Sequence, residues 1–181
     1  PNACVRSDGE RSKCRAREPR RGRLYSMVYG RPCVLMRDKV AKCPLYHVGL
    51  NEDTLSIATA GCNLTCLYCQ NWQYRCSAIK ESQIDAMKLA EAVDDRTACI
   101  CYFGGDPAPQ LPHALRASRL ARQRNAGRIL RICWETNGSM HPALLRQAAE
   151  LSLNSGGCIK FDLKAWSEEL HIALCGVSNK R

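Results

Sequence analysis

The sequence has no long apolar run and no recognisable secretory leader. No apolar stretch approaches the roughly 20 residues that a membrane-spanning helix needs. The first residues, PNACVRSDGERSKCRAR, carry positive charge, but no apolar stretch follows them as it would in a signal peptide. We therefore expect a cytoplasmic protein that does not contact a membrane. Its 181 residues are enough for one ordinary domain with a core, and too few to assume two.

The basic N-terminal segment also lacks interleaved aromatic residues. Residues 1–43 hold twelve Lys and Arg against four Asp and Glu, and no aromatic side chain stands among the arginines before Tyr25. Proteins that bind single-stranded nucleic acid commonly stack its bases on aromatic rings. We therefore interpret the charge as a solvated extension or a face for an acidic partner, and we keep RNA or DNA contact as the alternative.

Cysteine, by contrast, is abundant: there are 13 residues, an odd number that cannot pair completely. A secreted disulfide scaffold is usually smaller than this chain, and several helix-like stretches here contain no cysteine. Reduced thiols that serve a metal, together with buried spare thiols, are the better interpretation. Four cysteines in strand-like segments are expected to be small buried side chains: Cys99, Cys101, Cys133 and Cys158.

From residue 54 onward, strand-like and helix-like segments alternate. The predicted strands are 55–60, 98–103, 128–135 and 158–164, each short, apolar and ended by Gly, Asn or Asp. The predicted helices are 82–93, with Ser82 opening a Ser-x-x-Asp capping pattern, then about 109–125, 141–153 with Ser139 as a possible cap, and a last helix from Ser167. This alternation predicts βαβ units, a parallel sheet and an α/β fold.

The polar motifs follow the predicted strands. The loop GCNLTCLYCQNW follows the first strand, GGDP the second, ETNG the third, and DLK closes the fourth. In parallel α/β folds the chemistry lies at the carboxyl ends of the strands. We therefore expect these four loops to face one site. Four parallel strands cannot close an eight-stranded barrel, so the pattern predicts an open sheet or part of something longer.

The cysteine loop is the strongest chemical signal. Cys62, Cys66 and Cys69 are separated by three and by two residues. A cubane iron–sulfur cluster can take one thiolate on each of its four irons, so such a loop could bind three irons and leave the fourth open to a small molecule. Two alternatives remain: zinc, with a fourth ligand from Cys76, His47 or elsewhere, and three unliganded cysteines in a core.

These motifs resemble the radical S-adenosylmethionine (SAM) superfamily. Its signature is the Cys-x3-Cys-x-aromatic-Cys loop, with Tyr68 as the aromatic residue. In order along the chain, GRLYSMVYGR, KCPLYH, TAGCNLTCLYCQNW, YFGGDP, WETNG and FDLKAW are similar to the radical enzyme of the AmmeMemoRadiSam group, which is related to pyruvate formate-lyase activating enzyme and other glycyl-radical activases. The resemblance extends from about Cys14 to the last residue.

The resemblance implies a fold and a site. The fold is a partial (β/α) barrel with about four visible βα units (54–181) behind a basic, cysteine-containing extension (1–53), and relative to the family the chain ends early. The three loop cysteines are implied ligands of a 4Fe-4S cluster, and Tyr68 belongs to the cofactor loop. The other implied contacts are to SAM: Gly104, Gly105, Asp106 and Pro107 to its amino group, Glu135 and Asn137 to its ribose, and Asp162 and Lys164 near its carboxylate.

Two implied contacts have simpler alternatives. Asp106 replaces the usual Glu of the family and is one methylene shorter, which leaves its side-chain contact open while the backbone contacts are expected to remain. Lys164 faces the same side of its predicted strand as Asp162, and a basic side chain aimed inward is costly unless it meets an anion. The ligand carboxylate is one such anion, and an Asp162–Lys164 pair is the other possibility.

The implied function is reductive cleavage of SAM to methionine and a 5′-deoxyadenosyl radical that takes hydrogen from a substrate. The sequence does not identify the substrate, which could be a protein. The resemblance implies a flavodoxin or a ferredoxin as the electron donor. Two alternatives are an activase of a glycyl-radical enzyme and a truncated, non-catalytic iron–sulfur or zinc module that binds a partner or nucleic acid. Nucleic acid is not the partner we expect.

Overall fold

The centre of the protein is a mostly parallel sheet with the strand order β3-β4-β5-β6-β7. The structure, a computed structural model, describes residues 6–40, 52–76, 79 and 82–180. β3 pairs with β4 antiparallel, and β4 to β7 are parallel to one another. The strands are β3 (Pro32–Lys39), β4 (Asp53–Thr59), β5 (Thr97–Phe103), β6 (Arg131–Thr136) and β7 (Ile159–Phe161).

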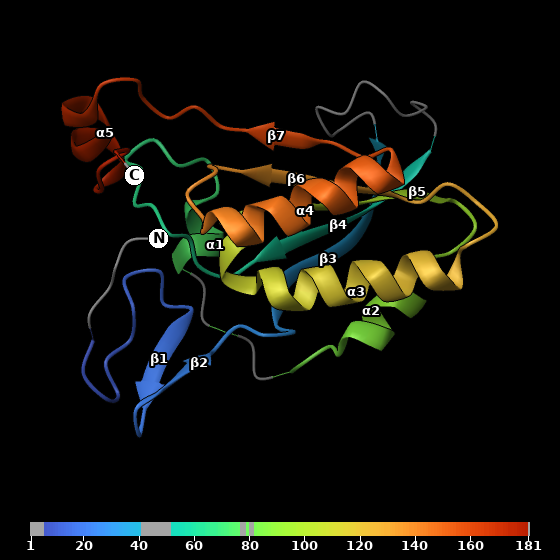
Figure 1. The fold of residues 1–181 in the computed structure, drawn as a ribbon, viewed down its shortest axis with the longest axis horizontal. Helices are drawn as coiled ribbons and strands as arrows, with labels where there is room; N and C mark the ends of the chain where they lie inside the picture. Colours follow the sequence, from blue (N-terminus) through green and yellow to red (C-terminus); the bar gives the residue numbers. More distant parts are fainter. Residues whose placement is uncertain (1–5, 41–51, 77–78, 80–81, 181) are drawn as a thin grey trace.

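Helices follow the parallel strands, and the two longest, α3 and α4, lie side by side across one face of the sheet (Figure 1). Alternate residues of the strands, such as Ile100 and Tyr102, point to this face and pack against these helices in the main core. The helices are α1 (Trp72–Cys76), α2 (Ala86–Glu91), α3 (Leu111–Arg124), α4 (Pro142–Ser155) and α5 (Glu168–Cys175), with a 3-10 turn at Ala108–Gln110 before α3. The predicted α/β class and mostly parallel sheet are confirmed.

The opposite face of the sheet carries smaller side chains. Cys99, Cys101 and Cys133 are fully buried there, and the half-buried Cys158 packs against them. These four cysteines therefore fill a narrow apolar layer, as expected for small hydrophobic side chains. Cys4 and Cys43 lie outside the described residues. So do the motif KCPLYH and His47.

Two predicted helix caps are wrong. Helix α2 begins after Asp85, whose carboxylate accepts a hydrogen bond from the Lys88 amide at 2.8 Å, and not after Ser82. The residues before Asp85 are held outside the helix because the Ile84 amide donates to the Gly30 carbonyl at 2.7 Å. Helix α4 is capped by the His141 ring and not by Ser139. The predicted start at Ser167 is confirmed for α5.

The segment predicted as an N-terminal extension contains three strands. β1 (Arg17–Arg20) and β2 (Arg23–Ser26) form an antiparallel hairpin beside one end of the sheet (Figure 1). β3 adds to the edge of the main sheet through its pairing with β4. The division at residue 53 stays a prediction, but hydrogen bonds between strands connect the residues on its two sides.

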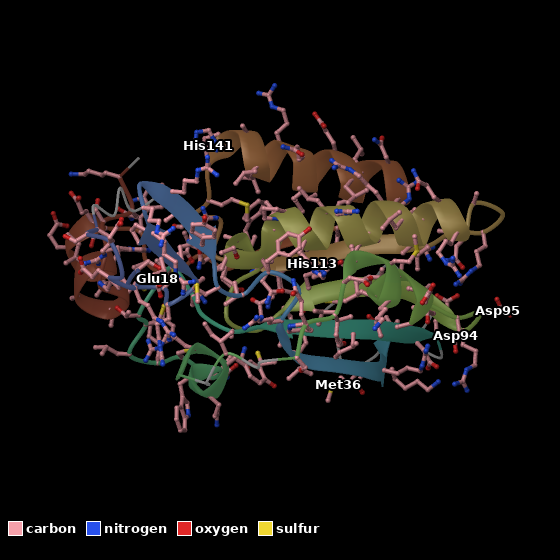
Figure 2. All side chains as sticks on the ribbon, turned by 90° about the horizontal axis from the view of Figure 1, so that it is seen from below. Glu18, Met36, Asp94, Asp95, His113 and His141 are labelled. Atoms are coloured by element: carbon pink, nitrogen blue, oxygen red, sulfur yellow. The ribbon has the colours of Figure 1, made fainter. Side chains whose placement is uncertain are left out.

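The two ends of the sheet differ in chemistry. Figure 2 places Asp94 and Asp95 at one end and Glu18 of the hairpin towards the other. Asp94 belongs to the amino end, where it binds Arg37 at 2.8 Å and Thr97 at 2.9 Å. The carboxyl ends carry the cysteine loop and the other motif loops. Within the part of the chain that the structure describes, no helix combines the length and apolar character needed to cross a membrane.

Candidate functional site

A cavity of about 550 Å³ lies at the carboxyl ends of the parallel strands. The loops after β4, β5, β6 and β7 all contribute to its wall, as the sequence predicted. This volume falls in the range of cavities that hold small ligands. The predicted site residues that line it are Cys62, Cys66, Tyr68, Cys69, Gly104, Gly105, Asp106, Glu135, Asn137, Asp162 and Lys164. Pro107 is absent from this wall and instead precedes the 3-10 turn.

The three loop cysteines open onto this cavity from different local environments. The Cys62 sulfur accepts from the Leu64 amide at 3.4 Å and from the Asn137 side-chain amide at 3.7 Å. The Cys66 sulfur lies 3.4 Å from the sulfur of Cys175, in the last turn of α5. No set of three or more His, Cys, Asp or Glu side chains in the described ranges is grouped closely enough to bind a single metal ion.

Three thiol side chains on one cavity wall fit a cluster that takes its thiolates on separate irons. The zinc alternative draws on Cys76 or His47, whose side chains lie outside the described part of the structure.

Burial favours the protonated form of the Cys62 and Cys66 thiols when no metal is bound. It raises the pKa of Cys62 to about 12, and the buried Asp106 carboxyl adds to the effect. Burial and the neighbouring Cys175 thiol raise the pKa of Cys66 to about 11. Metal ligands must be thiolates, so a cluster that binds here has to displace these protons with its own positive charge.

Gly104 and Gly105 bring the loop after β5 against the loop after β4. Both have positive φ, +61° and +60°. A Cβ atom on Gly105 would lie 2.5 Å from the carbonyl oxygens of both Thr59 and Gly61, and one on Gly104 would lie 2.7 Å from the Tyr74 ring. The packing of the two loops thus already requires glycine here, in addition to any need for close approach to a ligand.

Asp106 ties the loops after β5 and β6 together. Its carboxylate accepts hydrogen bonds at 2.9 Å from the Ala108 amide, the Thr136 hydroxyl and the Asn137 amide. The side chain is 1% exposed, and burial raises the pKa of Asp106, although these three hydrogen bonds partly oppose the shift. Its side chain therefore holds the wall of the cavity, and the backbone of the GGDP loop is the part left to contact a ligand.

The third-strand motif places an amide and a carboxylate beside the cysteine loop. The Asn137 side chain donates to Asn63 at 2.8 Å, and its oxygen accepts from the Ser139 amide at 2.8 Å. Glu135, one position from the end of β6, accepts from the Cys101 thiol at 3.7 Å and from Lys160 at 3.4 Å. Asn137 thus stabilises the turn after β6 and also lines the cavity. Glu135 points to the face of the sheet that carries Cys101.

The fourth-strand motif supplies two lysines and a carboxylate. β7 ends at Phe161, earlier than predicted, so Asp162 and Lys164 lie just beyond it. Lys164 binds one oxygen of Asp162 at 3.0 Å and Lys160 lies 3.3 Å from the other. Burial acts to raise the pKa of Asp162, but the two lysines outweigh it and lower the pKa. The Asp162–Lys164 pair therefore exists, and both residues still line the cavity.

Tyr68 connects the cysteine loop to the segment after β7. Its hydroxyl donates to the Lys164 carbonyl at 3.1 Å, and Cys175 lies 3.8 Å from the same oxygen. Burial and Cys175 raise the pKa of Tyr68 to about 12, so the phenol stays protonated and serves as a donor.

Sequence reasoning missed two residues at this site. Lys160 lines the cavity and could have been found by the same alternation that selected Asp162 and Lys164. Cys175 lies in a helix 106 residues after Cys69 and has no spacing signal. Only the tertiary structure brings it to the cysteine loop.

A mostly parallel sheet whose strand-end loops gather three cysteine thiols and two glycine residues around one cavity defines an α/β protein with a thiol-lined cavity at the strand ends. Comparison with known families gives a specific match: the Radical SAM superfamily model matches residues 56–180, from β4 to the segment after α5. The chain belongs to this superfamily.

A curated relative is also similar to this chain. The chain is 43% identical over 72 residues to a protein of Methanocaldococcus jannaschii described as Uncharacterized protein MJ0808. The matched stretch covers 40% of this chain and 22% of that protein.

Proposed function

We propose that the protein is a radical SAM enzyme in which Cys62, Cys66 and Cys69 bind a 4Fe-4S cluster and the neighbouring loops bind SAM. The observation that carries this proposal is the common cavity: its wall contains all three cysteines and loops from all four parallel strands. When bound, the reduced cluster would supply the electron for reductive cleavage of SAM, the chemistry that would let the enzyme take hydrogen from a substrate.

The chain's own residues bind and orient the cosubstrate in this proposal. The backbone of Gly104 and Gly105 contacts its amino group, and the loop keeps its shape because Asp106 is bonded to both neighbouring turns. Lys164 supplies a positive charge for its carboxylate, because the hydrogen bond and charge of Asp162 raise the lysine's pKa even though burial acts to lower it. Asn137 and Glu135 offer polar groups for the ribose hydroxyls.

The particular reaction is a narrower proposal. The motif order similar to the AmmeMemoRadiSam radical enzyme favours that group, with a glycyl-radical activase as the related alternative. We propose a protein substrate, because exposed apolar side chains flank the cavity wall: Leu163 is 80% exposed and Phe161 55% exposed. The electron donor would be a flavodoxin or a ferredoxin.

The test is anaerobic reconstitution of the 181-residue chain with iron and sulfide, followed by reduction. The electron paramagnetic resonance spectrum is recorded with and without SAM, and 5′-deoxyadenosine is assayed in the same sample. We expect the spectrum to change on adding SAM, 5′-deoxyadenosine to form, and both effects to be lost in Cys66→Ala. The matched control Cys33→Ser removes a thiol that lies outside the cavity wall and keeps a group able to bond the Ala58 carbonyl.

Other outcomes separate the alternatives. A cluster whose spectrum ignores SAM would identify a non-catalytic iron–sulfur module. Bound zinc with no iron uptake, together with RNA binding that weakens steeply with salt, would instead support the nucleic-acid module and refute the radical enzyme.

A further inference from the structure

Cys66 and Cys175 form a close pair of thiols at the site. Their sulfurs are 3.4 Å apart, and both residues are buried, with Cys175 0% exposed. Both are reduced in the structure. A disulfide bond is about 2.05 Å long, so the sulfurs need to approach by only about 1.4 Å to become bonded.

The backbone on both sides of this pair is fixed. The Thr65 amide donates to the Cys175 carbonyl and the Leu67 amide to the Leu174 carbonyl, each at 2.9 Å. The Thr65 hydroxyl also donates to the Cys175 carbonyl at 3.1 Å. These bonds flank Cys66 and hold its loop against the end of α5. The two thiols therefore stay neighbours without any cofactor to gather them.

The glycine that ends α5 allows this close contact. Gly176 has φ +75°, and a Cβ atom on it would lie 2.2 Å from the Thr65 hydroxyl oxygen. The Gly176 carbonyl also accepts a hydrogen bond from Lys13 at 2.9 Å. The end of α5 thus packs against the cysteine loop through contacts of Gly176 that do not involve the sulfurs of Cys66 and Cys175.

The two thiols differ in access. Cys66 contributes to the cavity wall, whereas Cys175 lies behind it and does not line the cavity. A small reagent in the cavity can therefore reach Cys66 first. Cys175 then lies close enough to react with the mixed disulfide formed on Cys66.

We propose that Cys66 and Cys175 are a thiol–disulfide exchange site that closes to a disulfide when the cysteine loop holds no cluster and a low-molecular-weight disulfide is present. The small fraction of Cys66 that is present as thiolate attacks that disulfide, forms a mixed disulfide and releases one small thiol. The Cys175 thiolate then attacks the Cys66 sulfur and releases the second small thiol. Two protein thiols are oxidised, one small disulfide is reduced, and the two protons pass to the released thiols.

The printed sulfur contacts of Cys62 are of a different kind. Its sulfur accepts from two nitrogen donors, the Leu64 amide and the Asn137 side chain. The Cys66 sulfur instead contacts the sulfur of Cys175. The Cys66–Cys175 pairing is therefore the one that the experiment below tests against links to Cys62 or Cys69.

The consequence for cluster assembly rests on the proposed function. A disulfide between Cys66 and Cys175 removes one of the three cluster ligands, so an oxidised chain cannot assemble the cluster until a dithiol reduces it. Oxidation of an empty site would then be reversible, because a disulfide protects Cys66 from irreversible oxidation to sulfinic acid.

The experiment starts from reduced, cluster-free protein incubated anaerobically with oxidised glutathione. Free thiols are then alkylated in denaturant and the chain is digested with trypsin followed by chymotrypsin. Trypsin yields one peptide of residues 43–75 with all three loop cysteines and one of residues 165–180 with Cys175. Chymotrypsin cuts after Leu64 and Leu67, so mass spectrometry can assign the linked cysteine.

We expect a fragment that links Cys66 to Cys175, loss of the alkylated Cys175 peptide, and full reversal by dithiothreitol. Iron uptake, measured after removal of the oxidant and without added dithiol, should fall in the oxidised wild type and recover after dithiothreitol. In Cys175→Ser no second thiol can displace the small thiol, so the fragment with Cys66 should keep a bound glutathione that the wild type does not retain. The control Cys33→Ser should behave as the wild type, which separates loss of this thiol from loss of any thiol.

Two results would overturn the proposal. The first is Cys175 that stays alkylated or links to Cys62 or Cys69. The second is oxidised wild type that takes up as much iron as reduced wild type. Failure of the proposed function looks different: fully reduced wild type would then assemble no cluster, although the Cys66–Cys175 link could still be found in the same digest.

Discussion

Replacing Asp106 by alanine tests whether its carboxylate holds the cavity wall together. Three donors point at this carboxylate, and a buried donor left without a partner costs about 1–3 kcal/mol. The Thr136 hydroxyl can rotate to another acceptor, which leaves the amides of Ala108 and Asn137. Removing a buried carboxylate also relieves its desolvation cost. We expect a net loss of about 2–4 kcal/mol in the free energy of unfolding.

The measurement is equilibrium urea unfolding of the reduced, cluster-free chain, followed by tryptophan fluorescence. Trp134 is a suitable probe because it is 1% exposed and stacks on Tyr102 at 4.5 Å. A loss below about 0.5 kcal/mol, the usual range of surface substitutions, would refute the structural role.

The same assay against pH checks the charge of Asp106. Since burial raises its pKa in the folded state, the folded chain holds this proton more tightly than the unfolded chain. The wild type therefore loses this contribution to stability as pH rises from about 3.9, the ordinary Asp value, through the raised pKa. The Asn side chain of Asp106→Asn does not titrate, so the variant has no such pH-dependent loss. Its free energy of unfolding should therefore rise relative to that of the wild type as pH rises. A constant difference between the two would contradict the raised pKa.

Three further predictions concern other parts of the structure. Gly105→Ala should lower the free energy of unfolding by about 3 kcal/mol or more, because a positive φ and a clash with backbone oxygens combine. The control Gly127→Ala should be nearly neutral, because a Cβ atom there meets open space. Equal losses for the two variants in urea unfolding would contradict the clash at Gly105. Asp94→Ala should lower the urea midpoint at neutral pH while leaving iron uptake unchanged. The hydrogen bond from Thr97, together with the charge of Arg37, lowers the pKa of Asp94 in the fold. Its stabilisation is therefore present above about pH 3.9 and disappears as pH falls through the lowered pKa. A midpoint difference that persists in acid would argue against stabilisation by the charged carboxylate. Lys164→Met should raise the pKa of Asp162, measured by carbon NMR of its carboxyl group, and an unchanged value would show that Lys164 does not stabilise that charge.

Much of the fold was predictable because its strands are short apolar runs with helical patterns between them. β4 and β5 lie within two residues of their predicted bounds. The start of β6 was misplaced because Arg128, included in the predicted strand, instead donates to the Thr97 carbonyl at 2.7 Å. The hairpin of β1 and β2 was missed because β1 is mostly charged and β2 is exposed along its whole length, so neither has an apolar pattern and only their pairing defines them.

The candidate site was predictable for a related reason. A parallel sheet places the loop after each strand on one edge, so motifs far apart in sequence could be assigned to one cavity. The role of the Asp106 side chain could not be assigned in this way, because its three donors come from two different loops.

The sequence alone determined which residues are candidates for cofactor binding and which end of the sheet they occupy, because cysteine spacing and the succession of strands are local properties of the chain. Tertiary structure decided which groups those residues contact. In the folded chain the buried Asp106 carboxylate is hydrogen-bonded to two loops, β3 pairs with β4, and Cys175 lies beside Cys66. Such contacts depend on the packing of segments up to 109 residues apart, for which a single sequence carries no local signal.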